Sequence, residues 1–460
     1  MLRSCCLAVF CLALVLPVQA QTTFTVNGTG DQSDATSSDG TCDVNPSQGG
    51  PQCTLRAAIQ QANATTATDV IAFEIPSSAT PSSPHVIEVS SSLPDIVEPV
   101  EIDGTTDSDH TDRPVIEIDG TNAGSGADGL TVAFEMGGGG GLVVKDIALV
   151  NFDDTGIILQ DDVAGNSIKG CHIGVRADGG TQAATDRGIF VGAGGDQTVI
   201  GGSLASDENV ISGNLKSALS VTATVRFVGN RVGLDLNGDP LPNGDSVFDV
   251  AIAINGDGVL VQGNTIAHNA GIGVQVNDIT PPDVGNTIRG NNMYANGGIG
   301  IDLEGGSEDG DGRTANDAGD GDDGQNRFQN YPEIQSAGYD AGTDEVTLTY
   351  FVDSDPTLTG DGASTYDLTI DFYRADADDE ESNGIIGTDT YTTTDYDGCG
   401  SPPCPKTITL TPLASVTESD DVIATATDAN GNTSEFSTPG RQLPLNWWRS
   451  RARPSIQESG

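Results

Sequence analysis

A repeated set of glycine and asparagine positions is the feature that most restricts how this 460-residue chain folds. One copy contains Gly263, Asn264, Ile266, Asn269, Gly271, Ile272 and Val274. These positions return 27 residues later as Gly290, Asn291, Met293, Asn296, Gly298, Ile299 and Ile301. A second register relates Gly170, Ile173, Gly174 and Gly179 to Gly229, Val232, Gly233 and Gly238. Repetition at periods of about 20–50 residues is typical of a solenoid.

Short apolar runs lie between these turn positions, at residues 258–261, 271–276 and 298–303. Each run has the two-residue period of a strand but is too short to bury a face alone, so it must stack on its neighbours. Asn and Gly suit the corners because they tolerate a left-handed backbone. A Gly-rich disordered region, the alternative, lacks such regular alternation. The pattern predicts a parallel β-helix over residues 69–335.

The pattern changes after residue 335 to longer alternating strands. We expect them at residues 345–352, 366–373, 385–393, 407–413 and 422–427. Turn signals separate the strands, which predicts an immunoglobulin-like β-sandwich over residues 336–440 as a separate domain. The basic tail at residues 441–460, which carries Trp447 and Trp448, is expected to be disordered, with a docking element as the alternative.

The N-terminus has the layout of a secretory signal peptide over residues 1–20. Arg3 precedes an apolar stretch, and small residues close the segment at Ala20. No later apolar stretch approaches the roughly 20 residues that span a bilayer. We therefore expect a secreted, extracellular monomer without a transmembrane segment, either free or associated with the cell surface.

The balance of charge excludes one class of partner. The chain has 67 acidic and 19 basic residues, a formal net charge of -48. Such a charge repels phosphate backbones and anionic lipid head groups, so nucleic acid is not an expected partner. It is typical both of a saline habitat and of Ca²⁺ binding. Composition does not separate these two explanations.

The cysteines predict two local disulfides. After removal of the signal peptide, Cys42 lies close to Cys53 and Cys399 lies close to Cys404 in the sequence. Close pairs of this kind form bridges in an oxidising compartment. Cys171 is left over and is expected to be a packed, unreactive thiol.

The segment Cys53-Thr54-Leu55-Arg56-Ala57-Ala58-Ile59 resembles the Cys-Ser-Leu-Arg-Glu-Ala-Ile signature of many secreted bacterial β-helix proteins. The resemblance continues at residues 71–76, 93–96, 100–106, 326–332 and 428–436. It implies a right-handed parallel β-helix. The signature itself predicts a short helix, capped by Thr54, that seals the first coil within an N-terminal cap at residues 21–68. Ala57 stands where the family has Glu, which weakens the start of this helix.

An acidic loop follows the last clear coil, at residues 302–323. Its Asp residues alternate with Gly, so a flexible backbone can fold carboxylates around a hard cation such as Ca²⁺. The ligands we expect are Asp309, Asp311, Asp317, Asp320, Asp322 and Asp323. A solvated acidic linker is the alternative, and the loop is no complete EF-hand. The four histidines are too scattered in the sequence to predict a transition-metal site: His85, His110, His172 and His268.

Two functions agree with these observations. Parallel β-helices include pectate lyases, polygalacturonases and alginate-modifying enzymes, but the chain carries no recognisable motif of those enzymes. We therefore expect a non-enzymatic extracellular protein that binds a polysaccharide or a cell-surface component, with no catalytic residue assigned. The alternative is a divergent polysaccharide lyase, glycoside hydrolase or epimerase.

Overall fold

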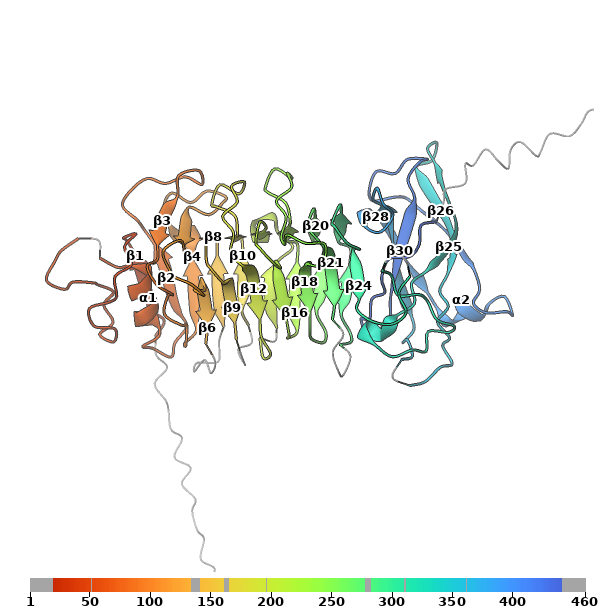
Figure 1. Ribbon diagram of the computed structural model, residues 1–460, viewed down its shortest axis with the longest axis horizontal. Helices are drawn as coiled ribbons and strands as arrows, with labels where there is room; N and C mark the ends of the chain where they lie inside the picture. Colours follow the sequence, from red (N-terminus) through yellow and green to blue (C-terminus); the bar gives the residue numbers. More distant parts are fainter. Residues whose placement is uncertain are drawn as a thin grey trace, which may run out of the picture.

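The computed structural model describes residues 20–50, 52–133, 141–160, 165–195, 197–277, 283–309, 312–360 and 362–440. It shows a parallel β-helix followed by a β-sandwich, as predicted (Figure 1). The helix runs along the long axis of the molecule, and the sandwich lies at its C-terminal end. Nearly all of the predicted signal peptide and the whole basic tail lie outside the described residues.

Three parallel sheets form the coils of the described helix. The first sheet contains β1 (Thr23–Val26), β2 (Asp69–Phe73), β4 (Val100–Asp103), β7 (Leu142–Lys145), β10 (Ser167–Lys169), β13 (Thr198–Gly201), β16 (Val225–Val228), β19 (Leu260–Gln262) and β22 (Thr287–Arg289). The second contains β3 (His85–Glu88), β5 (Ile116–Asp119), β8 (Ile147–Val150), β11 (His172–Ile173), β14 (Val210–Ile211), β17 (Arg231–Val232), β20 (Thr265–Ala267) and β23 (Asn292–Tyr294). The third contains β6 (Leu130–Val132), β9 (Thr155–Leu159), β12 (Arg187–Val191), β15 (Leu219–Val221), β18 (Val250–Ile254), β21 (Ile272–Val276) and β24 (Ile301–Leu303).

Apolar side chains stack in register along the inside of the helix. On the first sheet, one buried row is formed by Ile71, Ile102, Val144, Ile168, Ile200, Phe227, Val261 and Ile288. Each strand buries too little alone, but the stacked rows form one continuous core. The second register of the sequence repeat relates β11 to β17, which are two coils apart with β14 between them.

The repeated Gly-Asn pair forms the corners of the coils. Gly263 and Gly290 have positive φ angles of 65° and 62°, and each precedes a buried Asn. The Oδ1 atom of Asn291 accepts hydrogen bonds from the backbone N–H and the Nδ2 of Asn264 in the preceding coil. Asn264 does the same for Asn230. The asparagines therefore form ladders that satisfy buried polar groups at every step.

The N-terminal cap has the predicted helix, α1 (Leu55–Ala62). The side chain of Thr54 accepts from the N–H of Ala57 and caps the start of α1. Arg56 forms two hydrogen bonds with the carboxylate of Asp31. Its guanidinium also donates to two loop carbonyls beside the first coils. The motif residues thus fasten the helix over the open end of the first coil.

The sandwich consists of two antiparallel sheets. One contains β25 (Glu333–Asp340), β26 (Glu345–Phe351) and β29 (Lys406–Leu410), and the other β28 (Ser382–Tyr391), β27 (Leu368–Ala375) and β30 (Val422–Thr427). Short helices are α2 (Thr393–Asp397), η1 (Gly104–Thr106), η2 (Ala205–Asp207) and η3 (Gln325–Phe328). The pairing of β26 with β29 and of β27 with β30 matches the immunoglobulin-like arrangement. β28 ends before the predicted residue 393 because Thr392 caps α2.

The sandwich also closes the C-terminal end of the helix. Tyr373, Ile423 and Phe436 extend the apolar core of the coils into the sandwich. Glu381 accepts from the N–H and the Nδ2 of Asn296, at 2.8 and 2.6 Å, and so continues an asparagine ladder. Arg289 on β22 pairs with the carboxylate of Asp371 through two nitrogens, at 2.6 and 2.9 Å. The backbone donors of the last coil therefore meet acceptors from the sandwich.

Candidate binding surface and metal clusters

The acidic loop brings together three of the six predicted ligands. Carboxylate oxygens of Asp317, Asp320 and Asp322 lie within 4.8 Å of one another. Asp309 instead faces Arg313, with Oδ2 3.4 Å from its Nη1. Asp323 is exposed and outside the group. Asp311 lies outside the described residues.

Asp320 is the anchor of this acidic cluster. Its buried carboxylate accepts from Gln329 Nε2 at 2.6 Å, from the N–H of Asn330 at 2.9 Å and from Ser364 Oγ at 2.5 Å. Burial raises the pKa of Asp320 to about 7. Burial, and next the charge of Asp317, raises the pKa of Asp322 to about 6. Negative charge is thus costly here, and a cation would offset that cost.

A shallow hollow lies on the outer face of the third sheet. The register places Phe190 of β12 beside Ser220 of β15, and Ser220 beside Ala253 of β18. The two small side chains leave room next to the phenyl ring, and Phe248 is 88% exposed at the edge. The resulting hollow has a volume of about 380 Å³.

The hollow combines aromatic, basic and acidic side chains. Arg187 and Lys216 line it, together with Asp249. Lys216 pairs with Asp186 at 2.6 Å, whereas Arg187 lies 3.9 Å from the nearest carboxylate oxygen of Asp154. The guanidinium of Arg187 is therefore less tightly paired with a carboxylate than the ammonium group of Lys216. An exposed phenyl group next to hydrogen-bonding side chains is typical of a binding surface.

Both predicted disulfides are formed. Cys42 is bonded to Cys53 and Cys399 to Cys404. Cys171 is a free, buried cysteine, and burial raises the pKa of its thiol to about 12. Such a thiol is not a nucleophile at neutral pH. This environment agrees with the prediction that Cys171 is a packed, unreactive cysteine.

The structure also forms a cluster that the sequence did not predict. His85 lies with Asp107 and Asp109, and each offers a ligand atom within 4.8 Å of the others. The histidine begins β3, whereas the carboxylates follow η1 in the loop after β4. No motif links these positions, because their proximity depends on the stacking of two coils. The only available signal was the Asp-x-Asp spacing, which is common in so acidic a chain.

These features define a parallel β-helix protein with two disulfides, a candidate binding face and two clusters of metal-ligating side chains. Comparison with protein-family models and with curated proteins finds no match to this chain. No helix within the described residues is both long and apolar enough to cross a membrane.

Proposed function

We propose that the outer face of the third sheet binds an extracellular polysaccharide through the hollow between Phe190 and Phe248. The observation that carries the proposal is the exposed Phe248 and the half-buried Phe190 beside the small side chains of Ser220 and Ala253. A sugar ring has an apolar C–H face that packs on a phenyl group. Its hydroxyl groups would hydrogen-bond to side chains such as Arg187.

The repeating architecture supports a polymeric ligand. The hollow spans β12, β15 and β18, three successive coils, or about 10 Å along the axis at the usual strand spacing. An extended chain lying along this axis meets a new outward position at each coil. On either side of the hollow, the same outward row continues at Ile158 and Gln275. The ligand class is therefore a linear glycan rather than a single sugar.

The lining favours binding over cleavage. Among the described residues that line the hollow, Asp249 is the only acidic one. Glycoside hydrolysis ordinarily uses two carboxyl groups on opposite sides of the scissile bond. Cleavage by a divergent enzyme is retained as an outcome of the experiment.

Export of the protein is part of the proposal. The predicted signal peptide and the signature-like segment at residues 53–59 both favour a secreted bacterial β-helix protein. Two disulfides are compatible with an oxidising compartment outside the cytoplasm. The resemblance to that group of proteins is itself part of this proposal.

Ca²⁺ binding by Asp317, Asp320 and Asp322 belongs to the same proposal. Supporting observations are the proximity of the three carboxylates and the raised pKa values of Asp320 and Asp322. Oxygen ligands in a flexible Asp-Gly segment suit a hard cation. A cation here would stabilise the connection between the helix and the sandwich.

Affinity electrophoresis in gels containing pectin, alginate or a sulfated polysaccharide tests glycan binding. We expect at least one polymer to retard the protein, and Phe248→Ala to weaken its affinity at least about tenfold, or 1.4 kcal/mol. Leu204→Ala is the matched control, because Leu204, the residue directly before η2, is exposed but does not line the hollow. The appearance of new reducing ends or unsaturated sugars would show that the protein cleaves the polysaccharide rather than only binding it. Equal retardation of wild type and Phe248→Ala would exclude the hollow.

A further inference from the structure

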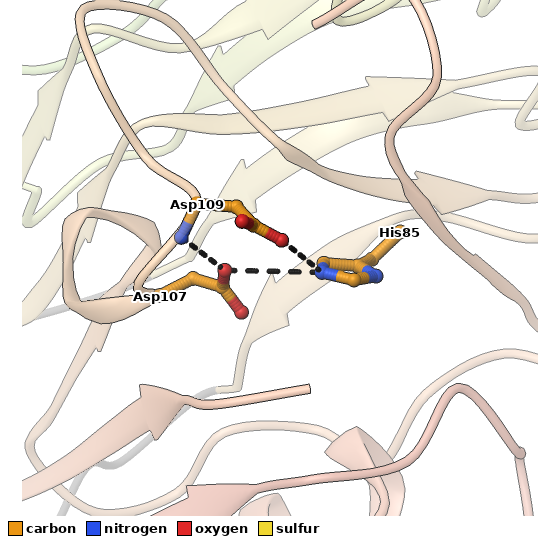
Figure 2. A group of neighbouring side chains, drawn as sticks. All are labelled: His85, Asp107 and Asp109. Carbon is orange, nitrogen blue, oxygen red and sulfur yellow. Dashed lines mark hydrogen bonds and ion pairs between the residues drawn. The ribbon is translucent and has the colours of Figure 1, made fainter. Parts of the chain in front are cut away.

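His85 is a buried side chain with one unused ring nitrogen. It is only 4% exposed at the start of β3. Its Nδ1 lies 3.3 Å from the Oγ of Ser77, whereas its Nε2 has no hydrogen-bond partner. A buried polar atom without a partner is costly, and native structures contain few of them. Figure 2 shows that this nitrogen faces the carboxylates of Asp107 and Asp109.

The distances leave room for an atom between the three groups. Nε2 of His85 lies 3.8 Å from Oδ1 of Asp107 and 3.7 Å from Oδ2 of Asp109. Both separations are too long for a hydrogen bond. Two ligands on a tetrahedral metal with bonds of about 2.1 Å lie about 3.4 Å apart. A contraction of a few tenths of an ångström would therefore bring Nε2 and each of these two oxygens to the separation that a shared ion requires. The ligand atoms of the two aspartates lie within 4.8 Å of each other.

Backbone groups already orient the two carboxylates. Asp107 accepts from the N–H of Asp109 at 3.0 Å and from that of Ile75 at 3.2 Å. Asp109 accepts from the N–H of Ala79 at 2.6 Å. The Ser77 hydroxyl likewise restrains the imidazole from its far side. Such outer partners hold metal ligands in place and are part of a built site.

We propose that His85, Asp107 and Asp109 form a binding site for one divalent transition metal ion, with Zn²⁺ the best match. An imidazole nitrogen with two carboxylates suits Zn²⁺ and its neighbours better than Ca²⁺, which prefers oxygen ligands alone. The side chain of Asp109 is 28% exposed, so water can supply a fourth ligand from that side. This site is independent of the glycan-binding face and of the acidic cluster.

The bound ion would join strand β3 to the loop at residues 107–115, near the N-terminal end of the helix. Hydrogen bonds with Ile75, Ser77 and Ala79 connect the ligands to the loop at residues 74–84 as well. Both loops leave the coils between a strand of the first sheet and one of the second. The metal would therefore act as a structural clamp on the first coils, and binding would raise the stability of the folded chain.

Zinc titration of the metal-free, full-length protein tests the proposal. Excess Ca²⁺ is included to occupy the acidic surface. We expect one tight Zn²⁺ per chain by calorimetry, a higher melting temperature with Zn²⁺, and visible absorption from bound Co²⁺. Because loss of an outer partner alone costs 10–100-fold, His85→Gln is expected to weaken Zn²⁺ binding at least about 100-fold. His110→Gln is the matched control, since His110 lies in the same loop but faces Asp146.

Asp109→Asn provides a second variant that keeps the fold. Its amide oxygen can still accept from Ala79, while the charge that holds the metal is lost. Equal Zn²⁺ affinity in wild type and in either variant would overturn the proposal. So would a melting temperature of the wild type that does not respond to Zn²⁺.

Discussion

Buried asparagine side chains specify how successive coils align. In the ladder that ends at the sandwich, Asn214, Asn243, Asn269 and Asn296 follow one another, and each Oδ1 serves the preceding residue. An apolar residue at these positions would remove the acceptor of a buried N–H and of a side-chain amide in the preceding coil. Polar ladders thus add register to a core whose apolar rows are similar from coil to coil.

Removal of one ladder side chain should therefore cost more than its size implies. We expect Asn269→Ala to lower the free energy of unfolding by about 2–4 kcal/mol, because it leaves more than one buried group unsatisfied. Chemical denaturation measures the change. Asn122→Ala is the control, because Asn122 is exposed. Similar losses in the two variants would show that the ladder adds no particular stability.

At the scale of elements, two glutamates of the sandwich complete the last coil. Burial raises the pKa of Glu381 and of Glu435 to about 8. Glu435 accepts from the N–H groups of Leu303 and Thr314, at 2.9 and 2.6 Å. The contact between helix and sandwich therefore depends on carboxyl groups whose raised pKa values favour the protonated form.

These pKa values predict the direction of a pH effect. A carboxyl group whose pKa is higher in the folded than in the unfolded chain stabilises the fold most below its unfolded value of about 4.5. That contribution is lost as pH rises from about 4.5 to 8. We expect Glu435→Gln to reduce the loss of stability over this range by on the order of a few kcal/mol, as measured by calorimetry. Glu418→Gln, at an exposed position, should leave the pH profile unchanged. A profile for Glu435→Gln that overlays the wild type would refute the assignment.

The acidic cluster makes a second prediction at this scale. Ionisation of Asp320 and Asp322 becomes costly between pH 4 and 7, so Ca²⁺ should raise the melting temperature more at pH 8 than at pH 5. A hundredfold excess over Kd contributes about 2.7 kcal/mol. Asp322→Asn with Asp317→Asn should remove the effect without breaking the hydrogen bonds of Asp320. Asp323→Asn should retain it. If Na⁺ at equal ionic strength acts as well as Ca²⁺, the loop is only a screened linker.

At the scale of the whole molecule, a cap covers each open end of the solenoid. Helix α1 packs on β1 and β2 at one end, and the sandwich lies against the last coil at the other (Figure 1). An uncovered edge of a β-helix is a template for pairing with another molecule. The caps thus explain how a long stack of short strands ends without further growth.

Truncation tests this role of the sandwich. A chain that ends at residue 332 exposes the last coil, and we expect it to form dimers or larger assemblies in light scattering behind size-exclusion chromatography. A chain that lacks only residues 441–460 keeps the cap and should elute as a monomer. A monomeric, folded product from the first truncation would show that the last coil needs no cover.

The sequence alone determined the architecture, because its main signals are local or periodic. Gly263 with Asn264 marks a corner wherever it recurs, and Thr54 caps a helix through contacts three residues away. Cys42 and Cys53 are close enough along the chain to pair without knowledge of the fold. Alternation likewise located five of the six described sandwich strands to within a few residues. It missed β25 (Glu333–Asp340), which crosses the predicted boundary between helix and sandwich at residue 335.

Only the tertiary structure decided which distant side chains meet. Phe190 pairs with Ser220, 30 residues on, and Ser220 with Ala253, 33 residues on, so the spacing changes from coil to coil. The loops that leave the coils differ in length, and the strand register therefore cannot be counted from the sequence. The hollow and the grouping of His85 with two aspartates both depend on that register. Chemistry that arises from neighbouring coils is thus set by stacking, while the coils themselves are set by local turn and strand preferences.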